Sequence, residues 1–144
     1  MTILKKSGMI TEKDHQTNLV IPFSVSPKAT ELTVRYSYHP KTVEDRKKAL
    51  ELLSDCAEKY EVNADDLSAL LPVNNLVTLS FDDPDGYRGA CHRQANEQII
   101  MIGEHSTPGI LNRKIISGQW DVVLNIHFAG CPINYSVEIA EVRQ

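Results

Sequence analysis

The stretch SFDDPDGYRGACHR, residues 80–93, concentrates side chains that can do chemistry. It holds three aspartates, two arginines, a thiol and an imidazole, which are the groups that a hydrolase or a metal site uses. Nearness in sequence does not by itself make a site, because the same residue types also build turns and structural ion pairs.

Asp83-Pro84-Asp85-Gly86 has the residue preferences of a type I β-turn, with aspartate first, proline second and glycine fourth. We therefore expect the chain to reverse direction here. The alternative is a calcium site, since Asp82, Asp83 and Asp85 offer oxygen ligands. The loop lacks the ligand spacing and the distal glutamate of an EF-hand, so the turn is favoured and no metal or cofactor is expected.

A second hypothesis is a metal- or cysteine-dependent hydrolase that uses Cys91, His92 and one of the three aspartates. A thiol beside an imidazole resembles a nucleophile beside its base. Neighbouring residues of a strand point to opposite faces, however, which works against contact between Cys91 and His92. The other histidines show no spacing typical of zinc ligands; they are His15, His39, His105 and His127.

Carbohydrate binding is a third hypothesis, and it needs exposed aromatic side chains. Trp120, Tyr36 and Tyr38 alternate in phase with aliphatic residues, which assigns them to the core. Only Tyr87 is expected in a loop and available to stack on a sugar.

Arg88 lies between Gly86 and Gly89, where the backbone can turn tightly. We expect its guanidinium to bind loop carbonyl groups or an acidic partner such as Asp82 or Asp85. The alternative is a solvated arginine at the end of a hairpin.

Composition narrows the class of protein. The 144 residues carry a formal charge of −4, which argues against binding nucleic acid. Three widely spaced cysteines, Cys56, Cys91 and Cys131, predict no disulfide framework and favour reduced thiols in the cytoplasm. Neither a signal peptide nor an apolar run long enough to span a membrane is recognised, so no membrane association is expected.

Alternation of apolar and polar residues predicts six strands. They lie in NLVIPFSV, ELTVRYSYHP, NLVTLSF, EQIIMIGE, QWDVVLNIHF and INYSVEIAEV, with GMIT and RKII as two further candidates. So many half-buried strands need two packed sheets. The sequence therefore predicts one all-β domain over residues 1–144, a two-sheet antiparallel β-sandwich of jelly-roll type.

Residues 41–72 interrupt this pattern. Ala49, Leu52, Leu53 and Cys56 have helical spacing, which predicts an amphipathic helix over residues 43–60. Asn63 is expected to cap a second helical turn that Pro72 ends. We expect the helical insertion to pack over one sheet or one sheet edge, where it would cover unpaired strand groups. The expected core contains Phe23, Val34, Tyr36, Leu79, Phe81, Trp120, Leu124 and Tyr135.

Several motifs together resemble those of a known family. They are Ile21-Pro22-Phe23, Val34-Arg35-Tyr36, the run from Asp83 to Gly89, Thr107-Pro108-Gly109 and Gly118-Gln119-Trp120. In this order they resemble the N-terminal β-sandwich domain of the CehA/McbA-like PHP metallohydrolases. Ala90-Cys91 stands where that family has tryptophan-serine, and the helical insertion is not part of its usual pattern.

The catalytic histidines and carboxylates of that family lie in the PHP domain that follows the sandwich. The resemblance therefore implies an accessory module without the enzyme, with a PHP-type hydrolase or another protein as its partner. On this basis we expect a non-catalytic module that binds a protein or a small ligand through its loops. The candidate ligand-binding residues are Asp83, Asp85, Tyr87, Arg88, His92 and His105.

Overall fold

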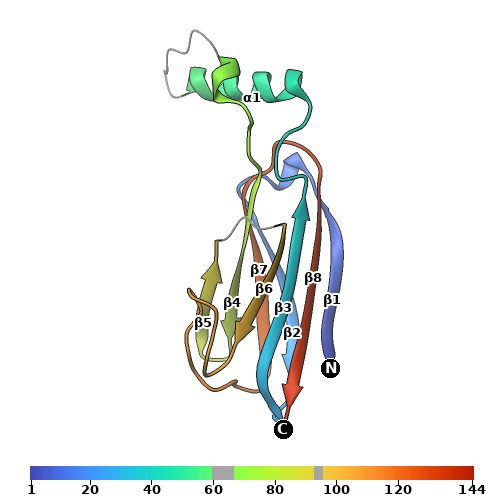
Figure 1. Ribbon diagram of the computed structural model, residues 1–144, viewed down its shortest axis with the longest axis vertical. Coiled ribbons are helices and arrows are strands. Elements are labelled where there is room, and N and C mark those ends of the chain that lie inside the picture. The colour runs from blue at the N-terminus through green and yellow to red at the C-terminus, as the bar shows by residue number, and fades with distance from the viewer. Residues whose placement is uncertain (60–66, 93–95) are drawn as a thin grey trace.

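The computed structural model describes residues 1–59, 67–92 and 96–144. Within these ranges, eight strands form two four-stranded antiparallel sheets that pack face to face (Figure 1). The strands are β1 (Thr2–Ile10), β2 (Asn18–Val25), β3 (Ala29–His39), β4 (Leu76–Asp83), β5 (Gly86–Cys91), β6 (Glu97–Ile102), β7 (Gly118–Phe128) and β8 (Ile133–Arg143). One sheet has the order β1-β8-β3-β6 and the other β2-β7-β4-β5. Successive strands alternate between the sheets except at the β4–β5 hairpin, which is jelly-roll topology and confirms the predicted fold.

Alternation places the core between the two sheets. In β2, Ile21 and Phe23 are buried, and they pair with Val122 and Trp120 of β7. The intervening residues of β2, Val20, Pro22 and Ser24, are exposed and face outward, as expected for sheets with one solvated face. All eight residues predicted for the core are buried: Phe23, Val34, Tyr36, Leu79, Phe81, Trp120, Leu124 and Tyr135.

The helical insertion caps one end of the sandwich. Helix α1 (Arg46–Lys59) and the short 3-10 helix η2 (Leu67–Leu70) lie beyond the ends of the strands (Figure 1). Ala49 is the buried residue of α1. The helix therefore lies across one end of the sandwich. The expectation that it would cover a sheet or a sheet edge is wrong. The predicted cap Asn63 lies outside the described residues.

A narrow ribbon connects this cap to the sandwich, which explains its position. Residues 41–43 and 73–75 run antiparallel, with Val43 N–H donating to Val73 O at 2.9 Å and Asn75 N–H donating to Lys41 O at 2.8 Å. We call these two segments the neck. Because the neck continues the direction of β3 and β4, the helix is carried past the sheets instead of folding back over them.

Two of the expected strands differ from the structure. GMIT is the end of a longer strand, β1, whose first half has exposed residues on both faces. RKII, residues 113–116, is irregular, because the carbonyl groups of Arg113 and Lys114 accept hydrogen bonds from Arg88 instead of a neighbouring strand. Among the described residues, no helix is long and apolar enough to cross a membrane.

Candidate functional site

The predicted turn forms the tip of the β4–β5 hairpin. Asp83 pairs with Gly86, which leaves Pro84 and Asp85 as the two turn residues. The Asp83 Oδ1 atom accepts a hydrogen bond from Asp85 N–H at 2.8 Å, as aspartate commonly does at the first position of a turn. Gly86 has a φ of 117°, a value that favours glycine.

Arg88 is the extra residue of a β-bulge. Asp82 pairs with Tyr87 and Phe81 pairs with Gly89, so Arg88 has no partner residue on β4. A bulge redirects the side chain that it carries. Here it directs Arg88 into the protein, where the side chain is fully buried, while Tyr87 stays on the outer face and is 63% exposed.

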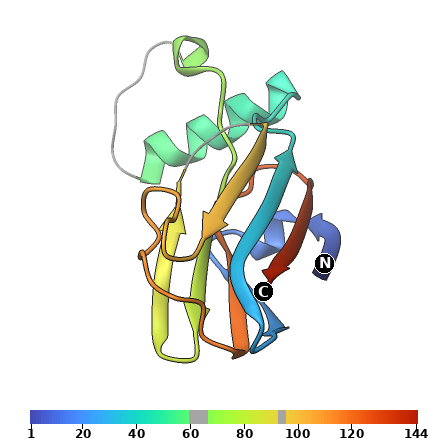
Figure 2. The ribbon, with the colours of Figure 1, turned by 60° about the horizontal axis from the view of Figure 1, so that its bottom comes forward.

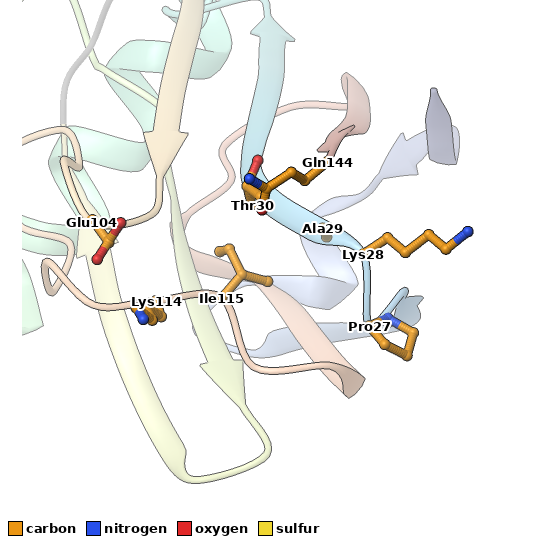
Figure 3. A pocket seen from close by; sticks show the side chains of 8 residues that line it. All are labelled: Pro27, Lys28, Ala29, Thr30, Glu104, Lys114, Ile115 and Gln144. Carbon is orange, nitrogen blue, oxygen red and sulfur yellow. The ribbon is translucent and has the colours of Figure 1, made fainter.

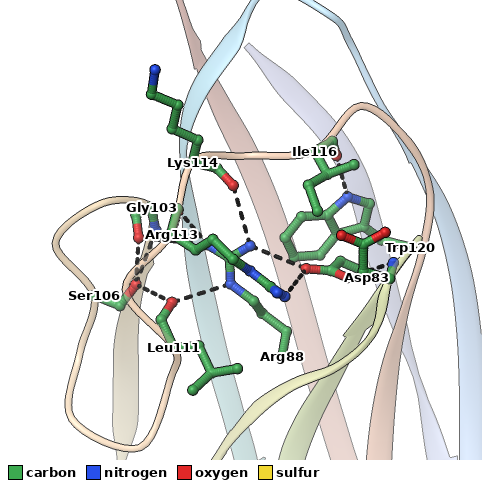
Figure 4. Close-up of polar contacts among 10 residues, drawn as sticks. Asp83, Arg88, Gly103, Ser106, Leu111, Arg113, Lys114, Ile116 and Trp120 are labelled. Carbon is green, nitrogen blue, oxygen red and sulfur yellow. Dashed lines mark hydrogen bonds and ion pairs between the residues drawn. The ribbon is translucent and has the colours of Figure 1, made fainter.

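Every N–H group of the Arg88 side chain has an acceptor (Figure 4). Nε donates to Leu111 O at 3.1 Å, Nη1 to Asp83 Oδ2 at 3.1 Å and Lys114 O at 3.4 Å, and Nη2 to Arg113 O at 2.6 Å and Gly103 O at 3.5 Å. The guanidinium carbon also lies 5.4 Å from the centre of the Trp120 ring. Arg88 therefore has no donor left for a ligand.

The prediction for Arg88 was right about the type of partner and wrong about which aspartate supplies it. The acidic partner is Asp83, whereas Asp82 and Asp85 had been expected. The carbonyl groups come from residues 103–114, more than a dozen positions away, and not from the loop that contains Arg88. Trp120 belongs to the same cluster, since its Nε1 donates to Ile116 O at 2.7 Å.

Asp83 is a buried carboxylate that forms ion pairs with two arginines, Arg88 and Arg113. Arg113 Nη2 lies 2.8 Å from the same Oδ2 atom that Arg88 approaches. Burial by itself would raise the pKa of Asp83, but the hydrogen bonds from Arg88 and Asp85 N–H and the charge of Arg113 hold that pKa below its usual range. Asp83 is therefore ionised at neutral pH. Arg113 was not among the predicted residues, because its sequence neighbourhood looks like a strand.

The segment from Gly103 to Ile116 closes the gap between the β5 and β6 edges of the two sheets (Figure 2). Ala90 N–H donates to Gly109 O, and Leu111 N–H donates to Arg88 O, which satisfies the outer edge of β5. Thr107 N–H donates to Met101 O and does the same for β6. Edge strands that stay unpaired invite aggregation, so this cover has a structural purpose.

The structure separates the predicted ligand-binding residues into two groups. Asp83 and Arg88 are buried together. Asp85, Tyr87 and His92 lie exposed on or beside the hairpin, and His105 lies exposed in the segment that Arg88 holds. The exposed residues thus lie on or beside the hairpin and on the covering segment, which the buried pair joins through hydrogen bonds to Gly103, Leu111, Arg113 and Lys114.

The residues of the hydrolase hypothesis do not converge. Cys91 points inward, where its thiol donates to Gln98 Oε1 at 3.3 Å, while His92 is exposed. Asp83 is engaged by the two arginines. Over residues 1–59, 67–92 and 96–144, no three histidine, cysteine, aspartate or glutamate side chains lie close enough together to hold a metal ion.

A recess of about 470 Å³ is lined in part by the C-terminal residue Gln144 (Figure 3), and the C-terminus lies at the opposite end from the helical cap (Figure 1). Its lining residues are Pro27, Lys28, Ala29, Thr30, Glu104, Lys114, Ile115 and Gln144. The two lysine side chains point in different directions, and Glu104 lies on the side of Lys114. This recess therefore shows no converging set of charges.

Comparison with known proteins assigns no family. No family model and no curated protein matches the chain. One solved structure that resembles it is described as "Crystal Structure of GEBA250068378 from Sulfurospirillum deleyianum", with 11% sequence identity, 95% of this chain and 98% of that chain covered, and a TM-score of 0.33. A likeness this distant supplies neither a ligand nor a reaction.

Proposed function

We propose that this chain is a non-catalytic binding module that recognises a protein partner through the surface around Tyr87, Asp85, His105 and Leu111. The observation that supports it is that Arg88, whose side-chain N–H groups all have acceptors, joins two segments, residues 82–92 and 103–116, through hydrogen bonds. Loops held on a rigid sandwich are common binding surfaces.

Rigidity lowers the cost of binding, because little conformational entropy is lost when a partner docks. Arg88 and Leu111 are joined through their backbones as well as through the side chain of Arg88. The side chain of Leu111 is 50% exposed, and that of Tyr87, the residue before Arg88, is 63% exposed. Exposed tyrosine side chains are frequent anchors of protein interfaces.

The partner that we propose is a PHP-type hydrolase, as the resemblance of the hairpin and strand motifs implies. The direct test is isothermal titration of the purified chain against the PHP-type hydrolase encoded nearest to it. Tyr87→Ala should weaken the interaction by about tenfold or more, the range of an interface anchor. Ile99→Ala is the matched control, because Ile99 is 54% exposed on the other sheet.

Three results would contradict this proposal. They are the absence of binding, equal effects of Tyr87→Ala and Ile99→Ala, and phosphodiesterase turnover by the purified chain that EDTA abolishes. The last result would show that the chain is itself a metal-dependent enzyme.

Carbohydrate binding is the second candidate, and one feature of the outer face of the β2-β7-β4-β5 sheet favours it. Tyr87 lies opposite Asp82, and Asp82 lies opposite Asp121, so an aromatic ring and two carboxylates form a row across three strands. A ring can stack on a sugar while carboxylates accept from its hydroxyl groups. A glycan array probed with the parent chain, Tyr87→Ala and Asp121→Asn tests this. A glycan that binds the parent chain and neither variant would support carbohydrate binding. The absence of any glycan signal for the parent chain would contradict it.

A further inference from the structure

Lys41 occupies an unusual position at the base of the neck. It lies two residues after the end of β3, and its carbonyl accepts from Asn75 N–H at 2.8 Å. Its side chain turns toward Tyr38, with Nζ 3.2 Å from the centre of the aromatic ring. Lys41 therefore stays at the junction between the sandwich and the helical cap.

The amine of Lys41 is buried and lacks a hydrogen-bond acceptor among the described residues. The Tyr38 ring compensates the charge in part, but it accepts no conventional hydrogen bond. A buried ammonium group without an anion is costly, and burial accordingly lowers the pKa of Lys41 to about 8. In the part of the chain that the structure describes, no carboxylate pairs with this ammonium group.

A cavity of about 430 Å³ is lined by Lys41 together with Asn74, Asn75, Leu76 and Phe128. The Asn75 side chain is already used, since its Nδ2 donates to Pro40 O at 3.0 Å and its Oδ1 accepts from Gly130 N–H at 3.0 Å. Leu76 and Phe128 supply apolar walls. The cavity thus combines an apolar lining with one cationic group, the combination by which small-molecule sites bind and orient a ligand.

We propose that this cavity binds a small monocarboxylate with an apolar body, whose carboxylate pairs with Lys41 while its body contacts Leu76 and Phe128. The lysine stem is flexible, and binding would require rotation about its side-chain bonds that brings Nζ from the Tyr38 ring to the ligand carboxylate. The exposed Asn74 supplies a further amide donor among the described lining residues. A phosphate or a dicarboxylate fits less well, because a second negative charge would face apolar walls with no second cation among the lining residues.

The experiment compares two probes with the same body and different heads: 3-phenylpropionate and 3-phenylpropan-1-ol. Binding to the full chain is measured by titration calorimetry and by amide chemical shifts. We expect the carboxylate to bind about tenfold or more tightly than the alcohol, and the shifts to centre on Asn74, Leu76 and Phe128. Lys41→Met keeps the apolar stem and should abolish the preference, whereas Lys47→Met, an exposed lysine on α1, should retain it.

Equal affinities for the two probes in the parent chain would overturn the proposal, as would shifts centred elsewhere or a preference that survives in Lys41→Met. Failure of both probes to bind would overturn it too and leave Lys41 as a structural partner of Tyr38. The comparison of probes on the parent chain does not depend on the folding of any variant.

Discussion

Arg88 Nη1 lies 3.1 Å from Asp83 Oδ2 inside the β4–β5 hairpin, and neither side chain reaches solvent. Each charge would be costly there without the other. Four carbonyl groups and Arg113 complete the pair, and all the carbonyl groups come from the segment that covers the β5 and β6 edges. The ion pair therefore ties the hairpin to that segment, and its first role is structural.

Arg88→Lys should lower the free energy of unfolding by about 1–3 kcal/mol. A lysine keeps the charge, but its ammonium group cannot reproduce the planar fork that reaches Leu111 O, Arg113 O and Asp83 at once. Several buried carbonyl groups would then lose their donor. Urea melts of the parent chain and the variant measure the difference.

His92→Ala is the control for this comparison and should leave stability close to that of the parent chain, because His92 is exposed at the end of β5. The structural interpretation of the hairpin would be wrong if His92→Ala were the more damaging change. It would also be wrong if Arg88→Lys were silent in stability and abolished the binding of a partner.

Asp83→Asn should be destabilising by about 3 kcal/mol or more, since it leaves the buried guanidinium of Arg88 without its anion. Asp82→Asn, the same chemical change one residue earlier, should not be destabilising, because Asp82 is only half-buried on the outer face and its neutralisation also relieves the repulsion with Asp121. Denaturant melts measure the free energy of unfolding of both variants. Their difference distinguishes the loss of the Asp83–Arg88 ion pair from the loss of any one negative charge. Similar effects of the two substitutions would contradict the prediction.

The gap in stability between the parent chain and Asp83→Asn should depend on pH. Burial alone would raise the pKa of Asp83, but Arg88, Asp85 N–H and Arg113 lower it in the folded state. The stabilisation by Asp83 is therefore complete above its unfolded pKa of about 3.9 and is lost as pH falls through the lower folded value. Melts at about pH 7, 5 and 3 should show the gap constant between the first two and smaller at the third. A gap that widens on acidification would contradict this assignment.

The sequence predicted most of the fold because a regular alternation reports a half-buried strand directly. β2, β3, β7 and β8 alternate over most of their length and were all recognised. β5 was missed because the bulge at Arg88 breaks the alternation and puts a charged residue inward. RKII looked like a strand because its residue types suit one, although its carbonyl groups serve Arg88.

The candidate site was less predictable, since its partners are distant in sequence. Turn preferences identified the hairpin tip correctly from Asp83 to Gly86. They could not choose among three neighbouring aspartates, because that choice depends on which carboxylate the bulge and the covering segment enclose. Lys41 gave no sequence signal, since its burial arises only where the neck meets Tyr38.

Gly89→Ala should be more destabilising than Gly86→Ala, although both glycines have positive φ values, 140° and 117°. A Cβ atom at Gly89 would overlap the Gly109 carbonyl oxygen and lie 2.6 Å from Ile110 Cα, whereas one at Gly86 meets nothing within 4 Å. Gly86→Ala carries only the backbone cost, about 1 kcal/mol or somewhat more, and Gly89→Ala should exceed about 3 kcal/mol. Thermal and urea melts decide the order. Equal costs would show that the covering segment can move away from β5.

Asp121→Asn should raise stability by a few tenths of a kcal/mol, up to about 1 kcal/mol. Asp121 and Asp82 are directly opposite each other on β7 and β4, and like charges in such pairs repel. The gain should shrink in about 1 M salt, where repulsion between surface charges is screened. The control is Asp121→Glu, which keeps the charge and should not stabilise. If Asp121→Asn is instead destabilising at both salt concentrations, Asp121 has a structural partner, and the carboxylate row beside Tyr87 is not held for a ligand.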